Sequence, residues 1–139
     1  AGIAQLRRMT TELYFLAASV FLGLVHLIAD SHLISFQYGY RWTASTRETP
    51  VPPLQGLANR VDQAYTNFME TFPFFAAVLL AAHFVGRHNA LTLWGAQLYF
   101  WGRLGYVQAA AAGFSKLRST LFFNFALIGM VLFLMALLR

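Results

Sequence analysis

The sequence contains no cysteine and few charged residues. Without cysteine the chain can form no disulfide, no thiolate nucleophile of its own and no cysteine-ligated metal site. Charged side chains make up 11% of the 139 residues, whereas soluble domains average about 25%. The hydrophobic share is 58%, which is more apolar surface than a single core of this size can bury. Lipid is therefore the natural solvent of the chain, and its length allows one domain.

The ten basic residues outnumber the five acidic ones, but they do not gather on one face. They are scattered over expected loops and chain ends, where arginines beside a membrane meet lipid phosphates or set the orientation. The missing basic patch argues against a nucleic-acid partner. The first apolar run follows Arg7 and Arg8, as in a signal peptide, but it is too long for one and continues to Asp30 and His32 without a cleavage site. We expect a retained span.

Four stretches are long and apolar enough to cross a bilayer, which takes roughly 20 residues. They cover about residues 13–34, 57–85, 91–112 and 121–138. The sequence thus predicts an all-α membrane protein, a single domain over residues 1–139 that forms a four-transmembrane-helix bundle. Both termini then lie on one side, and the two longer polar loops lie on the other, for which the arginine balance favours the cytoplasm. We expect a multi-pass protein of a bacterial inner membrane or an equivalent membrane.

A polar stripe runs along the first half of the second span. Its residues are spaced three, four and three apart, which places them on one helix face: Arg60, Gln63, Asn67 and Glu70. Pro73 follows, where it removes a backbone hydrogen bond and can kink the helix. Because polar groups are costly in lipid, the stripe is expected to face protein or a water-filled cavity. It either forms a functional site or holds helices together.

The third span carries an arginine near its middle, between two tyrosines. Tyr99, Arg103 and Tyr106 are spaced four and three apart and share one face. A buried guanidinium needs a counter-charge, and Glu70 is the best candidate in the sequence. We therefore expect an inward-facing ion pair between Glu70 and Arg103, whose disruption would cost about 3–5 kcal/mol. Such a pair is either structural alone or also holds a polar group of a ligand.

A fainter polar face lies on the first span, where Ser19, Gly23, His26 and Asp30 are spaced four, three and four apart. With His32 nearby a metal site can be imagined, but two or three nitrogen and oxygen ligands without a clear fourth are a weak signal. We interpret the face as a helix contact with a hydrogen-bonded His26–Asp30 pair, and we predict no metal site.

Several of these features together resemble the MAPEG family, the membrane-associated proteins in eicosanoid and glutathione metabolism. That family has four spans of this length, an Asn-x-x-Glu-x-x-Pro motif on the second, an arginine midway along the third, and an Arg-Ser pair after the third loop. The matching residues here are Asn67, Glu70, Pro73, Arg103, Arg118 and Ser119. The likeness in topology covers nearly the whole chain, although the motif itself is short.

The resemblance implies a homotrimer that binds glutathione as cofactor between neighbouring subunits. The residues that would bind glutathione are Arg60, Asn67, Glu70, Arg103 and Tyr106. Arg118, with Ser119 beside it, would be catalytic, because a fixed cation favours ionisation of the glutathione thiol. The implied activity is that of a glutathione-dependent transferase or peroxidase that acts on lipophilic electrophiles.

The chain departs from the family pattern at three positions. Gln63 and Thr66 stand where the family enzymes carry arginines, and a third-span tyrosine of those enzymes falls near Ala110. Each lost arginine removes a charge-assisted hydrogen bond of about 1.5–3 kcal/mol. An alternative is therefore a non-catalytic MAPEG-like protein that binds lipid or serves a larger membrane-protein partner. A third class, a small multidrug-type transporter, fits less well because its membrane glutamate normally lies on the first span.

Overall fold

The structure is a computed structural model that describes residues 2–139, and these residues form helices and loops without any strand. Along the chain the elements are α1 (Gly2–Arg7), α2 (Thr11–Tyr38), α3 (Tyr40–Ala44), α4 (Gly56–Phe84), α5 (Ala90–Ala112), the π-helix η1 (Leu117–Phe122) and α6 (Phe123–Leu138). The prediction of an all-α protein is confirmed.

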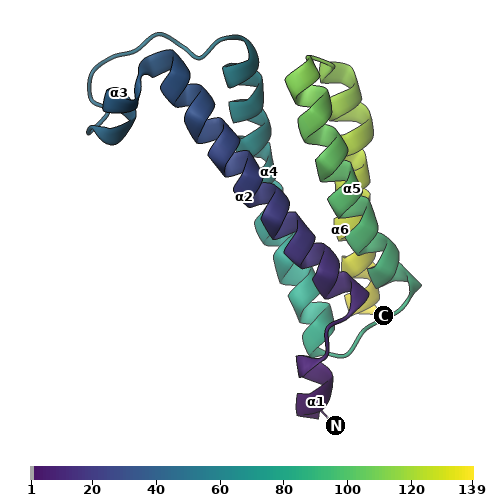
Figure 1. Ribbon diagram of the computed structural model, residues 1–139. Coiled ribbons are helices and arrows are strands. Elements are labelled where there is room, and N and C mark those ends of the chain that lie inside the picture. The colour runs from purple at the N-terminus through teal and green to yellow at the C-terminus, as the bar shows by residue number, and fades with distance from the viewer. Residues whose placement is uncertain (1) are drawn as a thin grey trace.

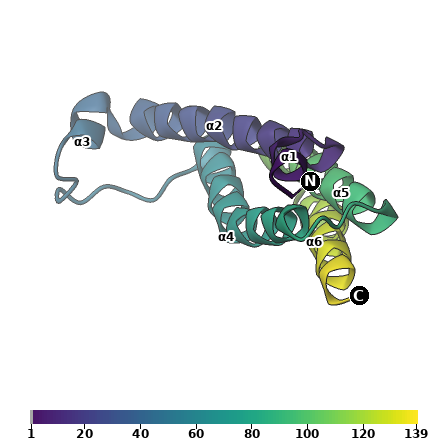
Figure 2. The same cartoon turned by 90° about the horizontal axis from the view of Figure 1, so that it is seen from below.

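The four long helices pack in two pairs that meet. Helix α2 crosses α4, while α5 runs beside α6, and α4 and α5 join the two pairs (Figure 1). The two chain ends lie at the same end of the helices, and α3 stands at the far end of α2, away from α5 and α6 (Figure 2). Helices α4 and α5 each contact every other long helix, so together they form the centre of the fold.

Local sequence signals set the helix boundaries. Helix α2 begins where the Thr10 hydroxyl accepts a hydrogen bond from the amide of Leu13 at 3.3 Å. Asn89 and Thr92 form a capping box at the start of α5. That helix ends at Gly113, whose φ of 87° is a left-handed conformation that glycine adopts without strain. The α4–α5 and α5–η1 connections are therefore tight.

Three helical segments are long and apolar enough to cross a membrane, namely Thr11–Tyr38, Gly56–Phe84 and Leu117–Leu138. Their outer surfaces carry large apolar side chains, such as Phe21, Phe74 and Leu138, which are 70%, 68% and 81% exposed. Helix α5 covers the third predicted span but is not among the three, because buried polar residues such as Arg103 lower its apolar content. That α5 also crosses the membrane stays a prediction.

The core lies where α4, α5 and α6 meet. The rings of Phe75 and Tyr99 stack with centroids 3.9 Å apart, and Phe133 packs edge-on against Phe75. Two glycines let α5 and α6 approach closely, since a Cβ added to Gly129 would lie 2.6 Å from the carbonyl oxygen of Gly95. This contact fixes the register between α5, which carries Arg103, and the helix that follows η1.

Candidate functional site

The predicted polar stripe of α4 lies along the edge of a helix contact. In the first half of α4, where the stripe lies, the buried residues are Ala58, Val61, Ala64, Phe68 and Thr71. All of them except Ala58 directly follow a stripe residue in the sequence. Consecutive residues are rotated by about 100° around a helix, so the stripe is offset by that angle from the buried face. The stripe is therefore turned partly outward. Asn67 is half-buried at the edge, and Glu70 is exposed.

The predicted ion pair between Glu70 and Arg103 is wrong for this chain. Arg103 is 2% exposed. Its Nη1 donates to Asn67 Oδ1 at 2.7 Å, and its Nη2 donates to the carbonyl oxygen of Ala64 at 3.4 Å. Glu70 forms no ion pair anywhere in residues 2–139. The physical reason is position along α4: Asn67 is close enough to accept a hydrogen bond from the guanidinium, while Glu70, three residues further on, is exposed.

Aromatic rings complete the surroundings of Arg103. The guanidinium carbon lies 4.1 Å from the ring centre of Tyr106 and 5.6 Å from that of Phe68, which is the geometry of cation–π attraction. The hydroxyl of Tyr99 is engaged by another group, since it lies 3.0 Å from that of Thr71. Arg103 thus keeps its charge buried through neutral partners, and its Nε has no hydrogen-bond partner.

Two other arginines line a small polar pocket where α4, the end of α5 and η1 meet. The pocket encloses about 70 Å³ and is lined by Arg60, Gln63, Ala110, Gly113, Ser115 and Arg118. Arg60 is anchored by a bond of 3.1 Å from its Nε to the carbonyl oxygen of Ala111. Neither Arg60 nor Arg118 pairs with an acid in the part of the chain that the structure describes. The pocket is therefore cationic and suits a small anionic group.

The π-helix η1 brings Arg118 to this pocket. Single π-helical turns are rare and are often found at functional sites. The hydroxyl of Thr120 donates to the carbonyl oxygen of Lys116, which supports the wide turn. Arg118 is half-buried, its guanidinium carbon lies 5.7 Å from the Tyr106 ring, and its Nε is buried without a partner. Tyr106 therefore lies between Arg103 and Arg118.

The structure gathers only part of the predicted site. Arg60 and Arg118 share the pocket, and Tyr106 contacts both Arg118 and Arg103. Asn67 is occupied by Arg103. The side chains of Glu70 and Ser119 are exposed and do not line the pocket. Glutathione binding and catalysis by any of these residues stay predictions.

Sequence reasoning missed Ser115 and Gly113 as pocket-lining residues. Gly113 could have been found, because a glycine at the end of a helical pattern marks a turn. Ser115 carries no comparable signal. Ala110 had been noted as a departure from the family pattern, and its small side chain helps to leave the space open.

A comparison with models of known protein families identifies the family of this chain. The model of the MAPEG family matches residues 15–138, which is nearly the whole chain. The chain belongs to the MAPEG family. No curated protein and no solved structure gives a match. The predicted resemblance is confirmed, and together with the three apolar segments it makes this MAPEG protein a multi-pass integral membrane protein in contact with lipid.

The predicted His26–Asp30 pair on α2 of this MAPEG protein is also wrong. His26 Nε2 lies 3.2 Å from the carbonyl oxygen of Val61 on α4, so its hydrogen bond crosses to the other helix. Asp30 is 6% exposed and lies beside Asp62, and its Oδ1 has no partner. One turn along α2 separates His26 from Asp30, and each meets a different part of α4. Within residues 2–139 no three His, Asp or Glu side chains converge on a possible metal site.

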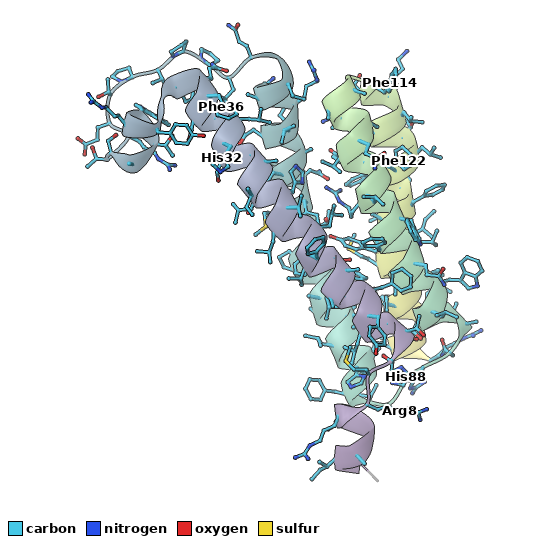
Figure 3. All side chains as sticks on the ribbon, in the orientation of Figure 1. Arg8, His32, Phe36, His88, Phe114 and Phe122 are labelled. Carbon is cyan, nitrogen blue, oxygen red and sulfur yellow. The ribbon has the colours of Figure 1, made fainter. Side chains whose placement is uncertain are left out.

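An apolar groove lies at the same end of α5 as the arginine pocket. It encloses about 320 Å³ between the small residues of α5 and the large ones of η1, and it is lined by Gly105, Gln108, Ala109, Ala112, Phe114, Leu117 and Phe122. Figure 3 shows Phe114 and Phe122 at this end of α5 and α6. Phe122 packs against Gly105, where an added Cβ would lie 2.3 Å from its ring. The groove suits an acyl chain or another slender apolar group.

The other end of α5 holds a polar cluster of a different kind. Glu12 is 7% exposed, and its Oε1 accepts a hydrogen bond of 2.9 Å from the Thr92 hydroxyl. Its Oε2 lies 3.6 Å from Nδ1 of His88. His83 reaches back to the N-terminal segment, with Nε2 2.8 Å from the carbonyl oxygen of Leu6. This cluster joins the start of α2 to the turn between α4 and α5.

Proposed function

We propose that this MAPEG protein binds glutathione at the pocket of Arg60 and Arg118 and transfers it to a lipophilic electrophile. The observation that supports the proposal is the convergence of two arginines, neither paired with an acid within residues 2–139, on one small pocket. An unpaired cation in a membrane protein marks a functional site by default. Glutathione offers two carboxylates and an ionisable thiol, each of which can accept hydrogen bonds from a guanidinium.

The size of the pocket limits what one chain can hold. A cavity of about 70 Å³ accommodates a group of a few heavy atoms, since one water molecule needs about 10–15 Å³ of such space. The pocket therefore holds one anionic group of glutathione, its thiolate, and the rest of the tripeptide extends over the exposed stripe of α4. Glu70 is exposed there without a cation, so it is free to accept the ammonium group. In the proposed homotrimer a neighbouring subunit covers this surface.

Arg118 is the proposed residue that stabilises the thiolate. When the thiol ionises, its proton passes to water, and the guanidinium holds the sulfur anion in place. The thiolate then attacks an electrophilic carbon, a carbon–sulfur bond forms, and the leaving group departs with its electron pair. We assign this role to Arg118 rather than to Ser119, because Arg118 lines the pocket and Ser119 does not. The apolar groove at the same end of α5 is the proposed site of the lipophilic second substrate.

Calorimetry on the detergent-purified protein tests the proposal. Wild type is expected to bind glutathione saturably, and Arg118→Gln to weaken binding by about tenfold or more, because it removes a charge-assisted hydrogen bond. Lys116→Gln is the matched control: it removes a cation two residues away that is exposed and does not line the pocket. Absence of binding at millimolar glutathione, or equal losses in both variants, would contradict the proposal.

The apolar groove favours a second candidate, a non-catalytic subunit that binds lipid. Its seven lining residues include no charged side chain, and Gln63 gives the arginine pocket a neutral amide where family enzymes carry a cation. Mass spectrometry of the purified protein distinguishes the two. A co-purified acyl lipid that is lost in Leu117→Gln, in a protein that binds no glutathione, would support the accessory function and exclude the transferase.

A further inference from the structure

The segment from His32 to Thr49 is folded, yet it packs against little of the rest of the chain. Its helix α3 has no buried residue and contacts α2 as its principal neighbour. Gly39, with φ of 95°, ends α2 and turns the chain sideways, so that α3 stands apart from α5 and α6 (Figures 1 and 2). We therefore expect the exposed apolar side chains of this folded segment to contact a surface outside this part of the chain.

Three exposed rings form one side of this segment. His32, Phe36 and Tyr40 contact one another, with ring centroids 5.8 to 6.3 Å apart. Nδ1 of His32 lies 2.8 Å from the hydroxyl of Tyr40. Phe36 and Tyr40 are 71% and 53% exposed, and Figure 3 shows His32 and Phe36 on the outer side of α2 near its end. The trio is thus preorganised but uncovered.

The same segment also presents two cations. Arg47 lies over the Trp42 ring at 5.6 Å, and its Nε donates to the carbonyl oxygen of Thr43 at 3.0 Å. The Trp42 indole is held in turn by a hydrogen bond of 3.0 Å to the carbonyl oxygen of Thr49. Arg41 and Arg47 are exposed, and neither pairs with an acid in the described chain. The guanidinium group of Arg47 is therefore held in place, and both guanidinium groups are open to an anion.

The aromatic trio continues a lipid-facing stripe of α2. Phe21, Val25 and Ile28 are 70%, 49% and 60% exposed, and their spacing of four and three leads on to His32 and Phe36 on the same face. Along this face the side chains change from wholly apolar to aromatic with a polar tip. That change is typical of the level where hydrocarbon gives way to lipid headgroups.

We propose that residues His32, Phe36, Tyr40, Arg41, Trp42 and Arg47, here called the headgroup platform, lie in the headgroup layer and bind an anionic phospholipid. The aromatic rings contact the glycerol region and the start of the acyl chains, and the two arginines hold the phosphate. This proposal is independent of glutathione binding, because it uses none of the residues of the arginine pocket.

Charge and continuity favour lipid over a second copy of the chain. The platform continues directly from the exposed apolar stripe of α2. Residues 32–49 contain two arginines and one acidic residue, Glu48, so the segment carries a net positive charge. A basic segment next to a spanning helix gains about 1 kcal/mol for each arginine from an anionic membrane surface, which corresponds to about fivefold in binding. Glu48 opposes this attraction.

Fluorescence of Trp42 measures where the platform lies. A Trp94→Phe/Trp101→Phe variant leaves Trp42 as the sole tryptophan, and both replaced side chains are more than half exposed. The variant is placed in vesicles of phosphatidylcholine brominated at different depths along the acyl chain. Quenching is expected to be strongest with bromine nearest the headgroup. If no brominated lipid quenches Trp42, because the segment lies in water or under a second copy, the proposal fails.

Energy transfer from Trp42 to dansyl-labelled lipid measures the preference for anionic lipid. Transfer to labelled phosphatidylglycerol is expected to exceed transfer to labelled phosphatidylcholine. Arg41→Gln/Arg47→Gln should lower this preference on the order of tenfold, and Glu48→Gln should raise it about fivefold. The control, Arg87→Gln/Arg139→Gln, removes two cations from the other end of the helices and should leave it unchanged. Equal transfer to both lipids in the parent variant would overturn the proposal.

Discussion

Glu12 and Arg118 lie near opposite ends of α5 and differ in what surrounds them. Glu12 is almost fully buried, and both of its oxygens face partners, the hydroxyl of Thr92 and the ring of His88. Arg118 is half-buried beside a pocket, faces no acid in residues 2–139, and keeps a buried Nε without a partner. Both oxygens of the Glu12 carboxylate are thus engaged by protein groups, whereas the Arg118 guanidinium has no acidic partner in the described chain.

The presence or absence of protein partners distinguishes polar residues that stabilise the fold from polar residues that can bind a ligand. A buried polar group with all its partners adds stability and rigidity. A cation without a partner beside a cavity adds little to the fold, but it can bind an anion strongly because it is already partly desolvated. Substitution of Glu12 should therefore alter stability, and substitutions at the arginine pocket should alter ligand binding.

Arg103 is expected to show the largest effect on stability, because it is buried at the centre and bonded to Asn67 and Ala64. Arg103→Ala should lower the free energy of unfolding by about 3–5 kcal/mol, since it leaves a cavity and unpartnered polar groups. Thermal unfolding in detergent, followed by circular dichroism, measures the change. Arg87→Ala, at an exposed site, is the control, and equal losses would refute a structural role for Arg103.

The glycine contact between α5 and α6 is expected to show the next largest effect. In Gly129→Ala the new methyl group would lie 2.6 Å from the carbonyl oxygen of Gly95 and 2.9 Å from the amide of Tyr99. Because backbone atoms cannot move aside cheaply, the variant should lose about 1–3 kcal/mol. Leu134→Ala, on the exposed side of α6, should lose less. The opposite order in unfolding temperature would show that the helices do not meet at the glycines.

Glu12→Gln tests directly whether the partnered Glu12 carboxylate stabilises the fold. The amide keeps the shape of the side chain but loses the charge that faces His88, and its hydrogen bond with Thr92 becomes weaker. We expect a loss of about 1–2 kcal/mol in the free energy of unfolding, measured in the same detergent. Glutathione affinity should stay unchanged, because Glu12 lies at the other end of α5. A variant of wild-type stability with altered glutathione affinity would reverse the roles assigned to Glu12 and the arginine pocket.

Glu70→Gln should have the smallest effect on stability, within about 0.5 kcal/mol, because its side chain is exposed and unpaired in the described chain. It is the matched partner of Glu12→Gln, since both replace a glutamate by its amide. A loss as large as that of Arg103→Ala would revive an ion pair between Glu70 and Arg103. Under the proposed function Glu70→Gln weakens glutathione binding without lowering the unfolding temperature.

The sequence predicted the family and the all-helical architecture, because both depend on features that are local in the chain. Long apolar stretches specify spanning helices, and the Asn67, Glu70 and Arg103 spacings specify the family. The partner of Arg103 could not be predicted in the same way. Asn67 and Glu70 lie on one helix face, and a spacing rule cannot decide which of two neighbours on that face reaches across to α5.

The pocket itself depends on a structure that spacing does not encode. The π-helix η1 places Arg118, and it contains a side-chain bond from Thr120 and the Phe122 ring that packs against Gly105. The first is a local hydrogen bond and the second is a tertiary contact, and neither produces a periodic pattern in the sequence. The sequence therefore identified Arg60 and Arg118 as candidates through the family resemblance, but it did not show that they share a pocket.

A double-mutant cycle of glutathione binding tests that shared pocket most directly. Calorimetry is carried out on wild type, Arg60→Gln, Arg118→Gln and the double variant. If both arginines hold the same anionic group, each single variant should weaken binding by about tenfold or more, and the double variant should lose clearly less than the product of the two. Unchanged affinity in Arg118→Gln, or losses that multiply independently, would contradict the account.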